Sequence, residues 1–187
     1  MAGGKGVTAA DAEDAYLVKR AREGYVEAYA ELVDRHGQLA YRVALRLLGN
    51  HHDAEDVAQE ALVQAWQQLP GFHGDSAYST WLYRIVTHLA LNRIRGARPA
   101  DSLDLLGDVH RSREEPVLDV ERDLNVDAVT AAVTALPAPQ RVAIVLHHFE
   151  GLPNEEVARI TGSSVAAVRS HLYRGRRALT RTLADWR

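Results

Sequence analysis

Apolar residues recur at three- and four-residue spacing along most of this chain. Leu39, Val43 and Leu47 form one such series, and a second runs from Ala58 to Leu69. This period places apolar side chains on one face of an α-helix. The alternation typical of a β-strand is nowhere sustained, so the pattern predicts an all-α protein.

Short polar residues and glycines divide this pattern into segments. Gly49 predicts the end of one helix, and we expect Asp53 to cap the next. Ser79 or Thr80 is expected to cap a further helix that begins at Trp81. Each boundary is predicted from residue types that satisfy the free backbone groups at a helix end.

Two stretches lack the apolar period. Residues 1–14 predict a disordered N-terminal tail, and residues 99–124, acidic and interrupted by proline and glycine, predict a flexible linker. The chain therefore divides into two small helical domains, residues 15–98 and 125–187, joined by an acidic linker.

A helix-turn-helix pattern closes the chain. Asn154 is expected to cap a short helix, Gly162 suits a tight turn, and Ser163 or Ser164 is expected to cap the second helix. The apolar face of that second helix is formed by Val165, Val168 and Leu172. These three lie within a sector of roughly 60° on a helical wheel and must face the first helix.

The opposite face of the second helix is small, polar and basic. It carries Ala166, Ser170, Tyr173, Arg174 and Arg177, with Arg169 and Arg176 on its flank. Such a face is compatible with a plain helical hairpin in water. Residues 163–187 hold six arginines against one acid, and together with the turn and the cap this favours DNA binding in the major groove.

Charge is segregated along the chain, although the net charge is only -3. Residues 51–83 contain five acids and no lysine or arginine, whereas residues 84–98 contain four arginines and no acid. Residues 101–127 are acidic again, with nine acids against three arginines. Two basic patches on a mildly acidic chain indicate two separate contacts with a polyanion.

The first acidic block contains a stripe of carboxylates. Asp53, Asp56 and Glu60 lie at positions i, i+3 and i+7 of one predicted helix, with no cation at i+4 to offset them. From the residues alone, a solvated helix face and a partner surface are equally good interpretations.

An aromatic segment, residues 72–85, precedes the first basic block. Aromatic rings beside arginines suit single-stranded nucleic acid, because bases stack on the rings while arginines hold the backbone. The alternative is that Phe72, Trp81 and Tyr83 belong to the core. For Trp81, which lies four residues before Ile85, the core is the better interpretation.

The composition excludes several kinds of site. With no cysteine, the chain has no disulfide, no cysteine-ligated metal and no thiol nucleophile. A metal site at His51, His52, Asp53 and Asp56, or at His147 and His148, is disfavoured because adjacent helical histidines point about 100° apart. We therefore expect no metal, no cofactor and no enzymatic activity. No run is apolar enough for membrane insertion, and a cytoplasmic location is the simplest expectation.

Several motifs occur in a characteristic order. They are DAEDVAQE at residues 53–60 with Trp66, STWLYRI at 79–85, LPAPQR at 136–141, EGLPNEEVA at 150–158 and SVAAVRSHLYRGRR at 164–177. In this order the chain resembles a bacterial extracytoplasmic-function (ECF) sigma factor of the sigma-70 family. The resemblance covers residues 28–183 and implies a region 2-like bundle and a region 4-like helix-turn-helix domain.

The resemblance also implies roles for residues. The contacts with the β′ clamp helices of core RNA polymerase would be Asp53, Asp56, Gln59 and Glu60. Melting and recognition of the −10 promoter element would involve Phe72, Ser79, Thr80, Tyr83, Arg84, Asn92, Arg93 and Arg95. Recognition of the −35 element would involve Ser164, Ala166, Arg169, Ser170, Arg174, Arg176 and Arg177. Relatives often carry an acid four residues after Asn92, where this chain has Gly96.

The implied partners are core RNA polymerase, through its β′ clamp helices and β flap, promoter DNA and an anti-sigma factor. The linker resembles the strap that occupies the RNA-exit channel in relatives. We expect a monomer in the free state. The alternative function is a stand-alone helix-turn-helix regulator, which usually needs a dimer, and the sequence has no heptad seam to form one.

Overall fold

The structure, a computed structural model, describes residues 8–96 and 124–184, and the side chains from residue 128 onward in the second range. Residues 99–123 of the predicted linker lie outside the described residues, and its last residue, Leu124, begins a helix. In order, the helices are α1 (Ala9–Arg22), α2 (Val26–Leu48), α3 (His51–Gln68), η1 (Leu69–Gly71), α4 (Tyr78–Gly96), α5 (Leu124–Thr134), α6 (Ala138–Ile144), η2 (Val145–Phe149), α7 (Asn154–Thr161) and α8 (Val165–Ala184). Within the described ranges the fold is all-α, as predicted, and no helix there is long and apolar enough to cross a membrane.

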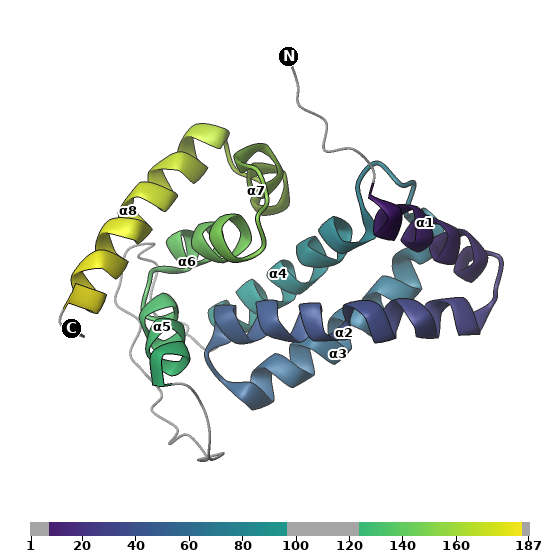
Figure 1. The fold of residues 1–187 in the computed structure, drawn as a ribbon, viewed down its shortest axis with the longest axis horizontal. Helices are drawn as coiled ribbons and strands as arrows, with labels where there is room; N and C mark the ends of the chain where they lie inside the picture. The colour runs from purple at the N-terminus through teal and green to yellow at the C-terminus, as the bar shows by residue number, and fades with distance from the viewer. Residues whose placement is uncertain (1–7, 97–123, 185–187) are drawn as a thin grey trace.

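The helices form two units that lie against each other. Helices α1 to α4 form the N-terminal bundle, and α5 to α8 pack against one end of it, with α8 on the outer side (Figure 1). We call these the N-terminal and C-terminal units.

The first helix begins earlier than the sequence predicted. Thr8 accepts a hydrogen bond from the backbone N–H of Asp11 at 3.1 Å, and the Asp11 carboxylate accepts one from the Thr8 backbone at 3.0 Å. This reciprocal cap stabilises the first turn, and Val18 and Ala21 are buried further along. The prediction of a disordered tail is therefore wrong for residues 9–14, while residues 1–7 lie outside the described part.

Helix α2 is the centre of the N-terminal bundle. It packs against α1, α3 and α4, and its buried face includes Leu32, Val43 and Leu47. Helix α3 meets it through small residues, among them Ala54 and Ala61, which have no exposed surface. Small side chains bring the two backbones close together, so the outer face of α3 is held rigidly and presents its polar residues to solvent.

Two helix starts differ from the predictions. Asn50, not Asp53, caps α3, because its side-chain oxygen accepts a hydrogen bond from the Asp53 backbone N–H at 2.9 Å. Helix α4 begins at Tyr78, three residues before the predicted Trp81. Gly49 does end α2, with the positive φ of 74° that glycine adopts easily.

The C-terminal unit contains the predicted helix-turn-helix. Gly162 ends α7 with a φ of 64°, and the Ser164 hydroxyl accepts a hydrogen bond from the Ala167 backbone N–H at 3.1 Å at the start of α8. The prediction for Asn154 is wrong, because it is the first residue inside α7 and Pro153 occupies the cap position. The predicted inward face of α8 is confirmed by Val168 and Leu172, both buried, with Val165 half-buried beside them.

The two units share one buried apolar cluster, which runs from Val18 in α1 to Leu172 in α8. At its centre, the buried guanidinium of Arg141 donates to the carbonyl of Leu47 at 2.5 Å and to that of Leu136 at 3.1 Å. The Leu47 carbonyl belongs to the last turn of α2, where helix carbonyls have no helical partner. Arg141 therefore fastens the C-terminal unit to the end of α2.

Gly175 permits a close crossing of α8 with α6. A Cβ atom at this position would lie 2.9 Å from Cγ1 of Ile144 in α6. We expect Gly175→Ala to lower the free energy of unfolding by about 1–3 kcal/mol, because the added methyl overpacks the crossing. Urea unfolding followed by circular dichroism measures this change.

Gly37→Ala in α2 is the matched control, because nothing lies within 4 Å of the added methyl. We expect that variant to gain about 0.5–1 kcal/mol from the better helix propensity of alanine. Equal effects of the two substitutions would contradict the role assigned to Gly175.

Candidate functional site

The acidic stripe of α3 lies at the surface, close to the end of α4. Asp53 and Asp56 are each about half exposed, with side-chain exposures of 42% and 49%. Arg93 of α4 reaches both carboxylates, with its Nε 3.2 Å from Oδ1 of Asp53 and its Nη2 2.8 Å from Oδ2 of Asp56. The guanidinium therefore spans the two acids as a fork.

This pairing corrects one premise of the sequence analysis. The stripe has no offsetting cation at i+4 on its own helix, but the cation comes from α4, 37 residues further along the chain than Asp56. The two members of the predicted set that lie further along the helix, Gln59 and Glu60, are exposed. The predicted polymerase-contact residues thus share one accessible helix face.

An apolar groove continues from this face. Its volume is about 620 Å³, and it lies between α2 and α3, lined by Val26, Tyr29, Val33, Gln59, Leu62, Val63 and Trp66. Val26 and Val63 are 62% and 56% exposed, which is unusual for two valines on neighbouring helices. Tyr29 is held in place in this groove, because its hydroxyl donates to the Leu62 carbonyl and the centre of its ring lies 4.8 Å from that of Trp66. Apolar surface of this kind favours contact with another protein.

The same acids form a cluster with a histidine. Ligand atoms of His52, Asp53 and Asp56 lie within 4.8 Å of one another. The guanidinium of Arg93 already pairs with both carboxylates, and Nδ1 of His51 is engaged by the Tyr41 hydroxyl at 2.6 Å.

The residues predicted to melt the −10 element are in part buried. Phe72 and Tyr83 are 8% and 7% exposed, and the Phe72 ring lies 4.8 Å from that of Trp81. Trp81 packs against the core, which agrees with its predicted position. Ser79 and Thr80 are half-buried at the start of α4. The aromatic segment is therefore mainly a structural support in this arrangement.

The other residues predicted to contact the −10 element are exposed to solvent. Arg84, Asn92, Arg93 and Arg95 are all exposed along α4. They present donors on one helix, while its buried residues, including Leu82 and Val86, hold it against the bundle. The predicted −10 residues therefore fall into two sets: exposed polar residues on α4, and aromatic residues that are buried in the bundle.

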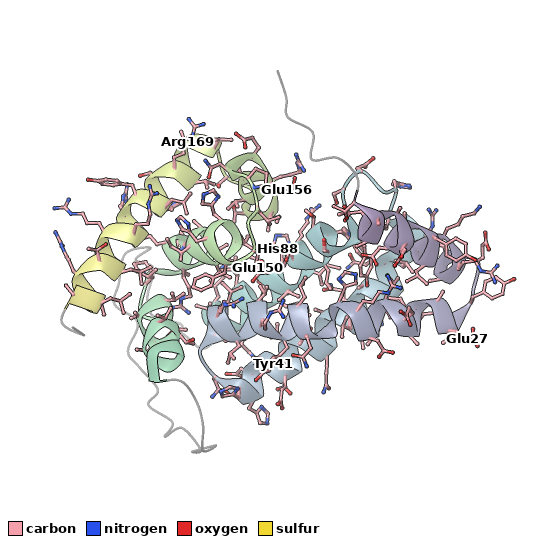
Figure 2. All side chains as sticks on the ribbon, viewed as in Figure 1. Glu27, Tyr41, His88, Glu150, Glu156 and Arg169 are labelled. Carbon is pink, nitrogen blue, oxygen red and sulfur yellow. The ribbon has the colours of Figure 1, made fainter. Side chains whose placement is uncertain are left out.

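Helix α8 presents the predicted −35 set on its outer side. The exposed members are Ser164, Ala166, Arg169, Arg174, Arg176 and Arg177, and Ser170 is half-buried. The Arg174 guanidinium donates to the Ser170 hydroxyl at 3.0 Å, which keeps both groups at one level of the helix. Figure 2 shows Arg169 pointing outward from the start of α8.

Positive charge on α8 also affects its neighbours. Burial lowers the pKa of His148, with further lowering by His147 and Arg176. Burial and Arg174 likewise lower the pKa of His171. Both histidines therefore favour the neutral form near neutral pH, and the charge of this face comes from its arginines.

The junction between the units contains polar residues that sequence reasoning missed. Glu150, whose side chain is 6% exposed, accepts from Nη1 of Arg46 at 2.7 Å and from the Tyr83 hydroxyl at 2.9 Å. His88 of α4 also reaches the C-terminal unit, because its Nε2 lies 3.0 Å from the Ile160 carbonyl of α7. Burial, followed by the charge of Glu150, raises the pKa of Tyr83, so its hydroxyl keeps the proton that it donates.

Burial also lowers the pKa of Arg141 to about 10, and the residue still carries its charge at neutral pH. The only hint of these junction contacts in the sequence is the occurrence of Arg141 and Glu150 in the motifs. Neither motif indicates that its polar residue faces the other unit.

Comparison with known proteins agrees with this arrangement. The family model for sigma-70 region 2 matches residues 32–100, and that for sigma-70 region 4 matches residues 127–179. The ECF RNA polymerase sigma factor SigW of Bacillus subtilis is 33% identical over 90% of this chain and 95% of its own length. The chain belongs to the ECF sigma factors of the sigma-70 family.

Other relatives agree with this assignment. The ECF RNA polymerase sigma-E factor of Escherichia coli is 33% identical over 89% of this sigma factor and 92% of its own length. Among solved structures, CnrH, in complex with the cytosolic domain of CnrY, has a TM-score of 0.70 at 27% identity and covers 92% of this chain and 98% of its own. Sigma factors of this kind bind core RNA polymerase and promoter DNA and direct the initiation of transcription. The family is in general not enzymatic, and the alternative of a stand-alone regulator is not favoured.

The junction of this sigma factor depends on the charge of Glu150. We expect Glu150→Gln to lower the free energy of unfolding by about 1–2 kcal/mol, because hydrogen bonds with a charged partner are the stronger ones. Urea unfolding of the full chain measures the effect.

Glu155→Gln is the control for this change. Glu155 is exposed on α7, and its change is expected to stay within about 0.5 kcal/mol. A Glu150→Gln variant as stable as this control would show that the junction does not require the carboxylate.

Proposed function

We propose that this sigma factor divides promoter recognition between its two units. Helix α8 reads the −35 element in the major groove, and the exposed donors of α4 hold the melted −10 strand. The observation that carries this proposal is the set of exposed arginines on α8, the helix that lies on the outer side of the C-terminal unit (Figure 1). The nucleotidyl chemistry belongs to the polymerase, and this chain supplies recognition.

In α8 we assign two kinds of contact. Arg169 and Arg176 lie on the flank of the helix and hold phosphates, which position the protein without reading sequence. Ser170 and Arg174, joined by their hydrogen bond, face the base edges and contribute to sequence discrimination. The small side chain of Ala166 allows the helix to approach the groove closely.

We assign the outer face of α3 to core polymerase. Asp53, Asp56, Gln59 and Glu60 form its acidic part and meet basic residues of the β′ clamp helices. Gln59 also lines the apolar groove, which extends the same surface toward Trp66. In such an interface the charged contact orients the two proteins, and the apolar contact buries surface that stabilises the complex.

The packing of the two units limits which residues can reach the melted −10 strand. The Tyr83 hydroxyl is bonded to Glu150, so this side chain meets a DNA base only after the C-terminal unit has moved away. Two promoter elements also have to be contacted by two units that are packed together in the free chain. We propose that core polymerase separates the units and sets their spacing, and that the free protein binds promoter DNA weakly.

The remaining partners follow from this role. We place the protein in the cytoplasm, with the polymerase and the DNA, and expect a monomer before polymerase binds. An anti-sigma factor is the third proposed partner. The sigma factor RpoE of Bartonella quintana, which shares the fold at a TM-score of 0.62, was solved in complex with the anti-sigma factor NepR.

Charge reversal tests the polymerase surface. We expect Asp53→Lys/Asp56→Lys to reduce affinity for core polymerase by more than about tenfold, because the two introduced lysines would repel the cations that the carboxylates attract. Fluorescence anisotropy of labelled sigma factor with purified core polymerase measures the affinity, and circular dichroism checks that the helices remain.

Asp34→Lys on the exposed side of α2 makes the same kind of charge change outside the proposed surface and should leave affinity within about twofold. Full core binding by the double variant would remove α3 from the polymerase interface.

The −35 assignment is tested by the dependence on salt. We expect Arg176→Ala to weaken holoenzyme binding to all promoters alike and to reduce the slope of log K against log salt by about 1. Arg174→Ala should instead change the preference among −35 sequences. Filter binding at several salt concentrations, with a set of −35 variants, separates the two effects. A uniform loss from both variants would contradict the division between base and phosphate contacts.

A further inference from the structure

Arg93 lies between two surfaces that the proposed function gives to different partners. It extends from the last turn of α4, in the polar group assigned to the −10 strand. Its guanidinium rests on Asp53 and Asp56, which are assigned to core polymerase. The Nε and Nη2 groups that hold these carboxylates are not available to a DNA phosphate or base at the same time.

The contact is not a buried support of the bundle. The Arg93 side chain is 43% exposed, and both carboxylates are open to solvent to a similar extent. Helices α3 and α4 pack through buried apolar residues, including Val57 and Val86. An ion pair this exposed is weak and can be exchanged for another partner.

The chemistry of the acid pair makes such an exchange direct. A guanidinium that bridges two carboxylates occupies the positions that an incoming lysine or arginine needs. Residues 51–83 contain no lysine or arginine, so α3 itself offers no other strong cation to these acids. His52 approaches Asp56 at 3.5 Å, but its side chain is 85% exposed.

We propose that Arg93 is an internal competitor of core polymerase for Asp53 and Asp56. In the free chain Arg93 holds the two carboxylates, and in the holoenzyme basic residues of the polymerase take its place. Arg93 is then released beside Asn92 and Arg95, where it adds a positive charge for the −10 strand. This inference rests on the proposed polymerase surface of α3.

The exchange couples the two binding events. Polymerase binding frees a cation for DNA, and a bound DNA strand that holds Arg93 keeps the carboxylates free for polymerase. Because coupling between two equilibrium affinities is reciprocal, each partner raises the affinity for the other by the same factor. The chain therefore favours DNA binding only after it has joined the polymerase.

The test is Arg93→Gln in the full-length sigma factor, compared with Arg95→Gln. Both substitutions remove one positive charge from exposed positions of α4, but of these two arginines only Arg93 is paired with the α3 acids. We expect Arg93→Gln to raise affinity for core polymerase by about two- to fivefold at low salt, the size of an exposed ion pair. Arg95→Gln should leave that affinity within about 1.5-fold.

DNA binding by the holoenzyme provides the second readout. With a single-stranded −10 oligonucleotide, we expect Arg93→Gln to weaken binding while core affinity rises. A third variant, Asp53→Asn/Asp56→Asn, removes the charges for which the partners compete. In that background, Arg93→Gln should no longer raise core affinity.

Each result decides the inference. Unchanged or weaker core binding by Arg93→Gln, or the same gain in the Asp53→Asn/Asp56→Asn background, overturns it. If Arg93→Gln lowers the melting temperature by more than about 5 °C, Arg93→Lys takes its place, with a smaller gain of the same sign expected. If Asp53→Lys/Asp56→Lys abolishes core binding while Arg93→Gln leaves it unchanged, the polymerase surface stands and the competition is refuted.

Discussion

The carboxyl end of α2 is the point on which both units depend. Along its length α2 buries Leu32, Val43 and Leu47 against the other helices of the N-terminal bundle. At its last turn the Leu47 carbonyl accepts from Arg141, and Arg46 pairs with Glu150. One of the carbonyls left free at the end of this helix is thus satisfied by a cation from the other unit, and the bundle and the helix-turn-helix are held together there.

The contact between the two units combines apolar packing with charged hydrogen bonds, which suits units that are proposed to pack together and to separate. The apolar part buries surface without direction, whereas Glu150 requires Arg46 and Tyr83 in fixed positions. Separation of the units would return Glu150 and Arg46 to water, and the hydration of both charges would offset part of the free energy lost with their contacts. In the packed state Tyr83 is buried, whereas the arginines of α8 are exposed on a helix at the outer side of the C-terminal unit (Figure 1).

Electrostatics links the recognition surfaces in a comparable way. The acids on α3 and the arginines on α4 lie on adjacent helices, and Arg93 joins them. A surface of this kind is poorly described as acidic or basic, because the charge available to a partner depends on which pairs the partner replaces. Among the described residues, no arginine of α8 pairs with a carboxylate, although Arg174 donates a hydrogen bond to Ser170.

The sequence by itself determined the local features of this protein. The apolar period predicted most of the helices, and Gly162 and Ser164 predicted the turn and the start of α8, because each of these features depends on residues close together in the chain. The order of the short motifs along the chain indicated the family. Local rules failed at the caps of α3 and α7. The cap positions are occupied by Asn50 and Pro153, not by the expected Asp53 and Asn154.

Only the tertiary structure decided the pairings that link distant segments. Arg93 meets Asp56 across 37 residues, Tyr83 meets Glu150 across 67, and Arg46 meets Glu150 across 104. The burial of Phe72 and the close approach at Gly175 are of the same kind. These contacts depend on how completed helices pack against each other, and the periodicity of one helix contains no information about which polar residue of another helix will face it.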